Sequence, residues 1–280
     1  MTRETRPGAA AAPLFSVVVP TFNRPDHVRG LLDALARQTL PQEQFEVILV
    51  NDGGRPLPPS LARECTLITR PHGGCAAARQ AGVAAARGRF LAFTDDDCRP
   101  APDWLARLKE ACFASPDSAV SGPVVNALPG LLPEASQLII TYLDPVIFSP
   151  TNNLAMPAAE YARVGGLDPA WAIAGGEDRD LCARWRKAGL KLLRCEAAVV
   201  AHHHELNLRA FWRQHFEYGR GAYQFRQRHL QEQRSSPRFY FDLIRFPFGR
   251  YPAPRAFTLA HLLALSQLAT AAGYLRQACS

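Results

Sequence analysis

Apolar residues in the first half of the chain fall into short runs separated by stretches of helical period. The short runs predict strands at 14–20, 45–52, 65–70 and 89–93. Apolar residues spaced three and four apart predict helices at 26–38, 74–87 and 103–115. Several strand runs are apolar throughout, which is typical of strands covered on both faces. The alternation therefore predicts an α/β fold with a mainly parallel central sheet, right-handed crossovers and flanking helices.

The alternation weakens after about residue 118. Proline-rich segments at 123–133 and 145–157 predict long loops that cover the site. A helix is expected at 177–189, because acids in its first turn match the helix dipole and Gly189 ends it. Residues 190–201 form a strand-like run that leads into three consecutive histidines.

From residue 208 onward the pattern is helical and rich in arginine. Between residues 202 and 255 the chain carries ten arginines and four acids, so the net charge of +7 is concentrated near the C-terminus. Such a basic part faces phosphates, anionic lipid or water, and the pattern alone leaves these open. The apolar segment 257–274 is short and polar for a spanning helix, so we expect it to lie on a membrane or to pack on the core.

Composition places the chain among ordinary globular proteins, with 48% hydrophobic and 20% charged residues in a length of 280. Residues 1–13 have no apolar period and are predicted to be a disordered tail, with no apolar core of signal-peptide length. The seven cysteines are scattered and form no Cys-x-x-Cys pair, which argues against a disulfide framework and against a structural zinc site. A cytoplasmic location is therefore expected.

Three carboxylates stand side by side directly after the strand predicted at 89–93, at Asp95, Asp96 and Asp97. Adjacent carboxylates repel one another unless a cation gathers them, and oxygen ligands suit Mg²⁺ or Mn²⁺. An acidic turn that caps the next helix is the structural alternative. Strand alternation would put Asp95 and Asp97 on one side, with Asp96 facing elsewhere.

Other polar residues at strand ends fit the same site. The histidines that begin at His202 offer a further metal ligand or form a surface cluster. Asp52, in "VNDGG", reaches a ribose or base edge, or simply forms an Asp-Gly turn. The glycine-rich stretch at 72–82 presents backbone amides at a helix start, but the Gly-x-Gly-x-x-Gly fingerprint is missing after the first strand.

Glu177 and Asp178 form a carboxylate pair at the start of a predicted helix. One of them can act as a general base, and the structural alternative is charge matching at the helix N-terminus, to which we assign Asp180. Trp171, just upstream, either offers an aromatic platform to a sugar or fills the core.

Six stretches taken in order resemble glycosyltransferase family 2, which has the GT-A fold. They are "VVVPTFNR", "VNDGG", "GGCAAARQAG", "FTDDDC", "GGEDRDLCARWRKAG" and "AVVAHHH", and the resemblance covers about residues 14–205. It implies an inverting transferase that moves a sugar from a nucleotide-diphosphate donor to a hydroxyl of a saccharide or lipid-linked acceptor, as in polysaccharide biosynthesis. It also implies a divalent cation, Mn²⁺ or Mg²⁺, and UDP as the default nucleotide.

The resemblance also implies roles for individual residues. The nucleotide-sugar would be held by Pro20, Thr21, Phe22, Arg24, Asp52, Arg79, Asp95 and Asp96. The metal would be held by Asp97, Asp95 and His202. Asp178 is the implied catalytic base, with Glu177 beside it, and Trp171 and Gly176 are assigned to the acceptor. The chain departs from the family pattern at Asn51, where Asp is frequent, at Gly54, where Ser is frequent, and at Gln80, where Asn is frequent.

The chain is thus expected to comprise a tail at 1–13, a catalytic domain at 14–205 and a helical, arginine-rich extension at 206–280 that contacts an anionic membrane surface. No nucleic-acid partner is expected. A nucleotidyltransferase on a similar sheet is a competing prediction, although the segment after the first strand lacks a Gly-rich loop with a lysine. A non-catalytic protein that binds nucleotide-sugars is the third.

Overall fold

The computed structural model describes residues 12–144, 148–171, 175–229 and 236–280. Nearly all of the predicted tail lies outside these residues. The strands are β1 Phe15–Thr21, β2 Phe45–Asn51, β3 Thr66–Thr69, β4 Phe90–Thr94, β5 Cys98–Pro100, β6 Ala119–Ser121, β7 Val124–Asn126, β8 Asn153–Pro157, β9 Leu192–Arg194 and β10 Val200–His202.

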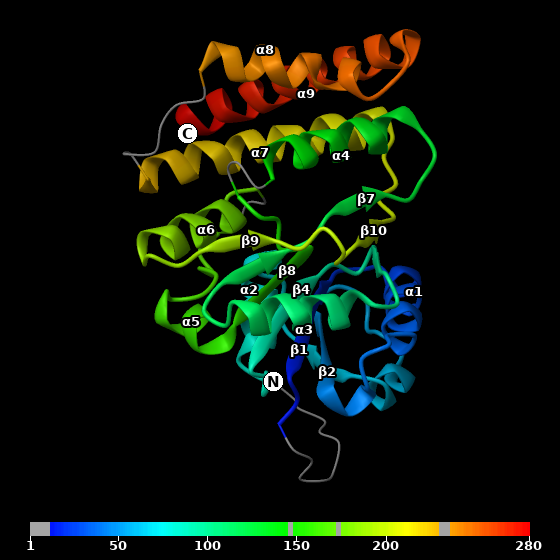
Figure 1. Ribbon diagram of the computed structural model, residues 1–280. Helices are drawn as coiled ribbons and strands as arrows, with labels where there is room; N and C mark the ends of the chain where they lie inside the picture. The colour runs from blue at the N-terminus through cyan, green and yellow to red at the C-terminus, as the bar shows by residue number, and fades with distance from the viewer. Residues whose placement is uncertain (1–11, 145–147, 172–174, 230–235) are drawn as a thin grey trace.

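Helices flank these strands and also form a separate layer (Figure 1). The α-helices are α1 Pro25–Ala36, α2 Cys75–Val83, α3 Trp104–Ala114, α4 Leu131–Leu143, α5 Ala158–Arg163, α6 Glu177–Lys187, α7 Leu208–Arg228, α8 Pro237–Arg245 and α9 Ala253–Ala278. Short 3₁₀ turns are η1 Gln42–Gln44, η2 Pro59–Arg63 and η3 Phe246–Gly249.

The central sheet has seven strands in the order β3-β2-β1-β4-β8-β6-β9. Neighbours pair in parallel except β8, which runs antiparallel to both β4 and β6. All seven residues of β1 are buried, as expected for a strand covered on both faces. The predicted mainly parallel sheet with flanking helices is therefore confirmed.

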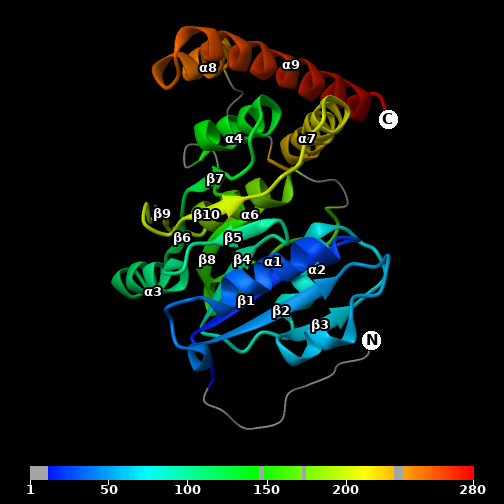
Figure 2. The same ribbon diagram turned by 90° about the vertical axis from the view of Figure 1, so that its right-hand side faces the viewer.

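A second, three-stranded sheet in the order β5-β10-β7 sits beside the first. Its strands are short, and β10 lies between the other two, antiparallel to β5 and parallel to β7. This small sheet brings the end of the 190–201 run next to the turn that follows β4. Figure 2 shows it between the central sheet and the helical layer.

Three sequence-based predictions of secondary structure were wrong. The proline-rich segments do not form only loops: the first contains β7 and the start of α4, and the second contains β8, in the middle of the sheet. Residues 145–147 lie outside the described residues. The run 190–201 is two strands of different sheets, β9 and β10, because a turn at Glu196 and Ala197 separates them. The helix predicted to end at residue 87 ends at Val83.

The three helices α4, α7 and α9 form a layer with α8 on one side of the sheets, at the top of Figure 1. Helices α7 and α9 approach closely where each has a glycine. A Cβ on Gly219 would lie 1.9 Å from the carbonyl oxygen of Thr270, and a Cβ on Gly273 would lie 1.9 Å from that of Phe216. Only glycine allows the two backbones to come this near.

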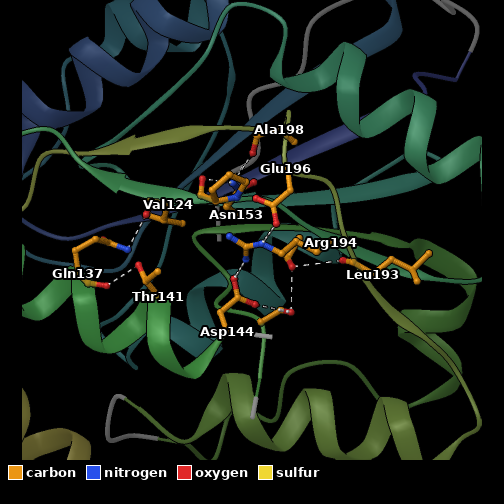
Figure 3. A network of polar contacts seen from close by, with 12 residues as sticks. Val124, Gln137, Thr141, Asp144, Asn153, Leu193, Arg194, Glu196 and Ala198 are labelled. Carbon is orange, nitrogen blue, oxygen red and sulfur yellow. Dashed lines mark hydrogen bonds and ion pairs between the residues drawn. The ribbon is translucent and has the colours of Figure 1, made fainter. Parts of the chain in front are cut away.

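A polar network attaches the end of α4 to the sheets (Figure 3). Arg194 on β9 pairs with Asp144, which is buried, and its Nε lies 2.6 Å from Oε1 of Glu196. Asn153 in β8 donates to the carbonyl oxygens of Pro123 and Ala198, at 3.0 and 2.8 Å. These bonds satisfy polar groups that the junction buries, so the helical layer is held at a fixed place over the sheets.

Within the described residues, α9 is the one helix whose length and composition would suit a membrane span. In its most apolar window, 39% of the residues are buried inside the protein. Leu259 and Leu263 lie in a core cluster with Phe211 of α7. One of the two expected arrangements, packing on the core, thus applies to this face of the helix.

Candidate functional site

A cavity of about 1500 Å³ extends from the loops at the carboxyl ends of the strands to the helical layer. Open α/β sheets bind ligands outside the carboxyl ends of their strands. The polar end is lined by Arg24, Arg79, Asp95, Asp97, Glu177, Asp178, His202 and His204. Most of the chemically reactive residues expected from the sequence therefore line one space.

The three consecutive aspartates lie in the turn between β4 and β5, not on a strand. The amide of Cys98 donates to the carbonyl oxygen of Asp95 at 3.1 Å and closes this turn. The strand-alternation argument for their directions was therefore wrong. Even so, Asp95 and Asp97 both line the cavity, whereas Asp96 does not appear in its wall.

Each aspartate has its own partner from another part of the chain. Asp95 pairs with Arg79 at 2.6 Å, and Asp96 accepts a hydrogen bond of 2.6 Å from the hydroxyl of Thr21. Arg24 reaches both Asp96 and Asp97, at 3.3 and 3.0 Å. The expectation that a cation alone offsets the repulsion was incomplete, because two arginines already reduce it.

The short sheet places a histidine beside the third aspartate. His202 in β10 pairs with Cys98 in β5, and the next amide, that of His203, donates to the carbonyl oxygen of Asp97 at 2.7 Å. As a result Nε2 of His202 lies 3.3 Å from Oδ1 of Asp97. His204 is close by, with its ring centroid 5.0 Å from that of His202.

Protonation of this pair follows from burial and mutual attraction. Burial would raise the pKa of Asp97, but its hydrogen bond to His202 and the charges of His202 and Arg24 outweigh burial and lower it. Burial would likewise lower the pKa of His202, and its hydrogen bond to Asp97 raises it. Burial raises the pKa of Asp96 to about 6, against the hydrogen bond from Thr21.

The donor atoms here fit a divalent cation. Ligand atoms of Asp97, Cys98 and His202 lie within 4.8 Å of one another. A carboxylate oxygen and an imidazole nitrogen are ligands that Mn²⁺ accepts. The thiol of Cys98 is fully buried, and burial raises its pKa well above its ordinary value. Asp95, the other expected ligand, pairs with Arg79 on the wall of the same cavity.

The first loop and the glycine-rich stretch meet near Asp52. Asp52 is buried, pairs with Arg70, and accepts a hydrogen bond of 2.7 Å from the amide of Gly74. Gly53 has a φ of +89°, and a Cβ there would lie 2.9 Å from the amide nitrogen of His72. The position of Asp52 allows both alternatives, an Asp-Gly turn and a contact with a nucleotide. Asp52 is not among the residues that line the cavity.

The segment after β1 contributes residues of different exposure. Pro20 and Thr21 end the buried strand, whereas Phe22 is 43% exposed and its ring lies 4.6 Å from that of His72. Arg24 is half exposed on the cavity wall. Phe22 thus presents an aromatic surface at the sheet edge, of the kind on which a nucleobase can stack.

Arg79 links the two acidic groups of the site. It lies on α2, is buried, and extends from Asp95 to Glu177, whose Oε1 is 3.9 Å from Nη1. Its Nε and Nη1 have no hydrogen-bond partner among the described residues. Arg79 was assigned to the nucleoside by resemblance, and the structure gives it carboxylates as neighbours.

Glu177 and Asp178 open α6 but have different surroundings. Oε2 of Glu177 accepts hydrogen bonds from the amides of Gly175 and Gly176, at 2.9 and 3.1 Å. Asp178 instead accepts from Thr151, through the hydroxyl at 2.8 Å and the amide at 3.2 Å. Burial and the charge of Glu177 raise the pKa of Asp178 to about 7, against Arg79 and Thr151. A carboxyl group that titrates near neutral pH suits proton transfer.

The residues assigned to the acceptor lie elsewhere than expected. Trp171 is only 2% exposed and belongs to a core cluster, and Arg228 lies over its ring at 4.6 Å from the centroid. This burial supports the alternative, core filling, and the assignment of Trp171 to the acceptor stays a prediction. Gly176 packs on this ring, because a Cβ there would lie 2.2 Å from it. Asp180 pairs with Arg184 and lies 2.8 Å from His229.

Two residues of the cavity wall were missed by the sequence analysis. Thr151 lies in the segment expected to be a covering loop, and no spacing marks it as a partner of Asp178. Arg179 was not singled out in the predicted helix, although it lines the cavity beside Asp178. Only the folded chain brings them to the site.

Comparison with known proteins identifies relatives of this site. The family model described as Glycosyl transferase family 2 matches residues 16–155, and one described as the N-terminal domain of galactosyltransferase matches residues 141–205. The pre-mycofactocin glycosyltransferase of Mycobacterium tuberculosis is 32% identical over 234 residues, which are 76% of this chain and 48% of that protein. The chain spans 34% to 48% of the length of the first curated relatives that it matches.

Two solved structures share the fold. The mannosyltransferase PcManGT from Pyrobaculum calidifontis, in complex with GDP-Man and Mn²⁺, has a TM-score of 0.61 at 16% identity, over 96% of this chain and 90% of that one. TarS 1-349 of S. aureus, in complex with UDP-GlcNAc, has a TM-score of 0.56 at 16% identity, over 93% and 89% of the two chains. At this identity the likeness shows the fold, and the predicted GT-A type of α/β fold is confirmed.

Proposed function

The chain belongs to glycosyltransferase family 2, whose model matches half of it, and from this we propose that it transfers a sugar from a nucleotide-diphosphate donor to an acceptor hydroxyl. The observation that supports this most is that one cavity is lined by both the Asp97–His202 pair and Asp178. A charged leaving group and a proton acceptor are needed on opposite sides of the reacting carbon. The leaving group is the diphosphate of the donor, whose charge a cation held by Asp97 and His202 would offset, and Asp178 would be the proton acceptor.

Asp178 is the proposed general base. It takes the proton of the acceptor hydroxyl as the hydroxyl oxygen forms its bond to the anomeric carbon of the sugar. The bond from that carbon to the diphosphate oxygen breaks, and its electron pair leaves with the diphosphate. One displacement from the opposite face inverts the configuration at the anomeric carbon. General base catalysis of this kind contributes roughly 10²- to 10⁴-fold in rate.

Thr151 and Glu177 are proposed to position this base. The two hydrogen bonds from Thr151 fix the orientation of the Asp178 carboxylate and favour its charged form. Oε2 of Glu177 is held by two backbone amides, which fixes this carboxylate beside Asp178. Its negative charge keeps the Asp178 carboxyl basic.

Asp97 and His202, with Asp95, are the residues proposed to hold a divalent cation, Mn²⁺ or Mg²⁺. When bound, such a cation offsets the negative charge that grows on the departing diphosphate. Imidazole among the ligands favours Mn²⁺. PcManGT is described in complex with Mn²⁺. The proposal for this chain rests on the chemistry of its own donor atoms.

The donor and acceptor are proposed by class. Pro20, Thr21, Phe22, Arg24, Asp52, Arg79, Asp95 and Asp96 remain the residues proposed to contact the nucleotide-sugar, and UDP is the proposed nucleotide. The acceptor is a saccharide or a lipid-linked molecule, as in polysaccharide biosynthesis. Residues 14–205 are proposed as the catalytic domain and residues 206–280 as its helical extension.

Association with the inner surface of the cell membrane is proposed for the helical extension. Phe241, Phe248 and Phe257 are 57%, 43% and 57% exposed, and Arg245 and Arg250 lie over aromatic rings in the same region. Exposed aromatic and basic side chains together suit an anionic lipid surface. Sedimentation with anionic vesicles should therefore be reduced in Phe248→Glu, and unchanged sedimentation would contradict this location.

Isothermal titration calorimetry with UDP and GDP, each with and without Mn²⁺, tests the proposed function. We expect one nucleotide to bind with an affinity that Mn²⁺ increases at least about tenfold, since the diphosphate and the carboxylates share the cation. EDTA should reverse this. Failure of both nucleotides to bind, with or without Mn²⁺, would contradict the proposal.

A further inference from the structure

The end of the cavity farthest from the aspartates is apolar and is built by helices to which the mechanism assigns no role. On α9, the apolar residues Ala264, Leu268, Ala271 and Leu275 recur at helical spacing and line it, with Gln267, Thr270 and Tyr274 among them. Leu268 and Leu275 are 64% and 63% exposed. The facing wall comes from α4 and α8 and comprises Ile139, Ile140, Leu143, Phe239, Leu243 and Ile244.

Arg179 is the cation of the cavity wall that is adjacent in sequence to the proposed base, and Arg186 and Arg226 line the same cavity. Arg179 follows Asp178 in α6, lines the cavity, and lies over the ring of Phe148 at 5.2 Å from its centroid. Its Nε is buried and has no hydrogen-bond partner, and none of the described carboxylates forms an ion pair with its guanidinium. By contrast, Arg24 and Arg79 both pair with aspartates.

Arg179 is partly buried, and a guanidinium whose Nε is removed from water without an anionic partner is costly. Burial lowers the pKa of Arg179, and the negative charge of Asp178 opposes this shift. Desolvating an unpaired charge disfavours the folded state, and a ligand anion that pairs with it recovers part of that free energy on binding. Arg179 is therefore suited to pair with an anionic group in the cavity.

The size of the cavity leaves room for a second molecule. Its volume is about 1500 Å³. Pockets for a single small ligand measure about 300–1,000 Å³. A nucleotide-sugar at the aspartate end would therefore leave the apolar end unfilled. Most side chains at this end are apolar and offer no hydrogen bonds to a saccharide, so this end suits a molecule with an apolar part.

We propose that the apolar end binds the acceptor, and that the acceptor is an amphiphile with an apolar chain and one anionic group. The chain lies between α4, α8 and α9, the anion pairs with Arg179, and the hydroxyl to be glycosylated lies at Asp178. The identification of the bound amphiphile as the acceptor rests on the proposed function. The binding site itself requires only the apolar wall and Arg179.

The geometry explains why these features occur together. Asp178 and Arg179 are consecutive residues of one rigid helix, so an anion held by Arg179 fixes its molecule close to the base. The apolar wall then supplies most of the affinity, at about 25 cal/mol for each Å² of apolar surface removed from water. Arg179 determines which end of the amphiphile points toward the aspartates.

Displacement of a fluorescent reporter tests the proposal without turnover. N-phenyl-1-naphthylamine, a neutral apolar dye, should bind the full-length protein with increased emission. Dodecyl phosphate, below its micelle concentration, should displace the dye at about one tenth of the concentration that 1-dodecanol requires, because a charge-assisted hydrogen bond contributes to its binding. Inorganic phosphate should not displace it, since the chain is needed.

Substitutions separate the contribution of Arg179 to binding from that of the apolar wall. Arg179→Met should remove the tenfold preference for dodecyl phosphate and leave displacement by dodecanol unchanged, and Arg179→Lys should retain most of the preference. Leu268→Glu should weaken dye binding at least about fivefold, because a charge then faces the apolar wall. The matched controls are Arg63→Met, an exposed arginine of η2, and Leu208→Glu, an exposed leucine at the start of α7 outside the cavity. Both should behave as the wild type.

Titration of the same variants with UDP and Mn²⁺ separates this inference from the proposed function. UDP should neither displace the dye nor lose affinity in Arg179→Met. Loss of UDP affinity there would overturn the inference, because Arg179 would then serve the donor. Absence of dye binding, or an unchanged preference for dodecyl phosphate in Arg179→Met, would also overturn it. If UDP still binds, neither of these two results contradicts the proposed function.

Discussion

The hydroxyl of Thr151 donates a hydrogen bond of 2.8 Å to Oδ1 of Asp178, and the amide of the same threonine lies 3.2 Å from Oδ2. Thr151 lies just before β8, the antiparallel strand in the middle of the sheet. The proposed base on α6 is thus tied to the sheet rather than to its own helix. Both bonds favour the charged carboxylate, against burial and Glu177.

Replacing Thr151 should move the pH dependence of transfer. Thr151→Val keeps the shape but removes the hydroxyl, so the charged form of Asp178 loses a hydrogen bond and its pKa rises. We expect the midpoint of the rise of kcat with pH to move up by about one unit, since a hydrogen bond to a charged group contributes about 1.5–3 kcal/mol.

A series of rate measurements between pH 5.5 and 9 would detect this shift. The matched control is Thr141→Val, because the hydroxyl of Thr141 bonds to the carbonyl oxygen of Gln137 within α4 and Thr141 is not among the residues that line the cavity. A profile for Thr151→Val that coincides with that of the wild type would show that Asp178 does not set the pH dependence.

Asp178 should also reduce stability at alkaline pH. Its pKa is raised in the folded state to about 7 from the ordinary 3.8, so the folded protein binds a proton more tightly than the unfolded chain does. The stability that this tighter proton binding contributes to the folded protein is fully present below pH 3.8 and is lost as the pH rises toward 7. At pH 8 the buried charge therefore destabilises the fold.

Asp178→Asn removes that charge and should raise the free energy of unfolding at pH 8, by on the order of 1 kcal/mol or more. Urea unfolding at pH 8 and at pH 5 measures it, and the gain should shrink at the lower pH. A variant that loses stability equally at both pH values would contradict the raised pKa.

Asp97→Ala should abolish the effect of Mn²⁺ on binding of the nucleoside diphosphate. Asp97 lies 3.3 Å from His202, and no other residue of the described chain replaces its carboxylate beside that imidazole. Calorimetric titration of UDP with and without Mn²⁺ gives the result, with Asp33→Ala, an exposed helical aspartate that pairs with Arg29, as control. Undiminished Mn²⁺-dependent affinity in Asp97→Ala would require other ligands.

Gly273→Ala should separate α9 from α7. Alanine is the better helix former by about 1 kcal/mol, but its Cβ would meet the carbonyl oxygen of Phe216 at 1.9 Å. Such overpacking costs about 1–3 kcal/mol, so thermal or urea unfolding should show a net loss of stability. Gly249→Ala is the control, because nothing lies within 4 Å of a Cβ there. A stabilised Gly273→Ala variant would mean that the helices can move apart freely.

Local periodicity was sufficient to predict most of the first half of the fold. β1 and β2 are apolar runs whose period and ends are explicit, and α1 has its apolar residues on one face with proline at its start. Each signal lies within a few residues of the element that it predicts. The order of these elements then limits the topology to a mainly parallel sheet.

The parts that were missed depend on contacts between distant segments. β8 has only five residues, follows a proline-rich stretch, and becomes a central strand because β4 and β6 leave a place between them. The direction of the aspartates is set by the turn before β5 and by Arg24, Arg79 and Thr21. The role of Thr151 depends on its meeting Asp178, which lies 27 residues away.

The most direct test of the account is the release of nucleoside diphosphate from a panel of nucleotide-sugars by the wild type and by Asp178→Asn, at pH 8 with Mn²⁺. We predict that both proteins bind the same donor with similar affinity, and that the variant is at least about 100-fold slower in transfer, as loss of a general base requires. Equal release by the two proteins, with equal donor affinity, would contradict the assignment of Asp178 and with it the proposed mechanism.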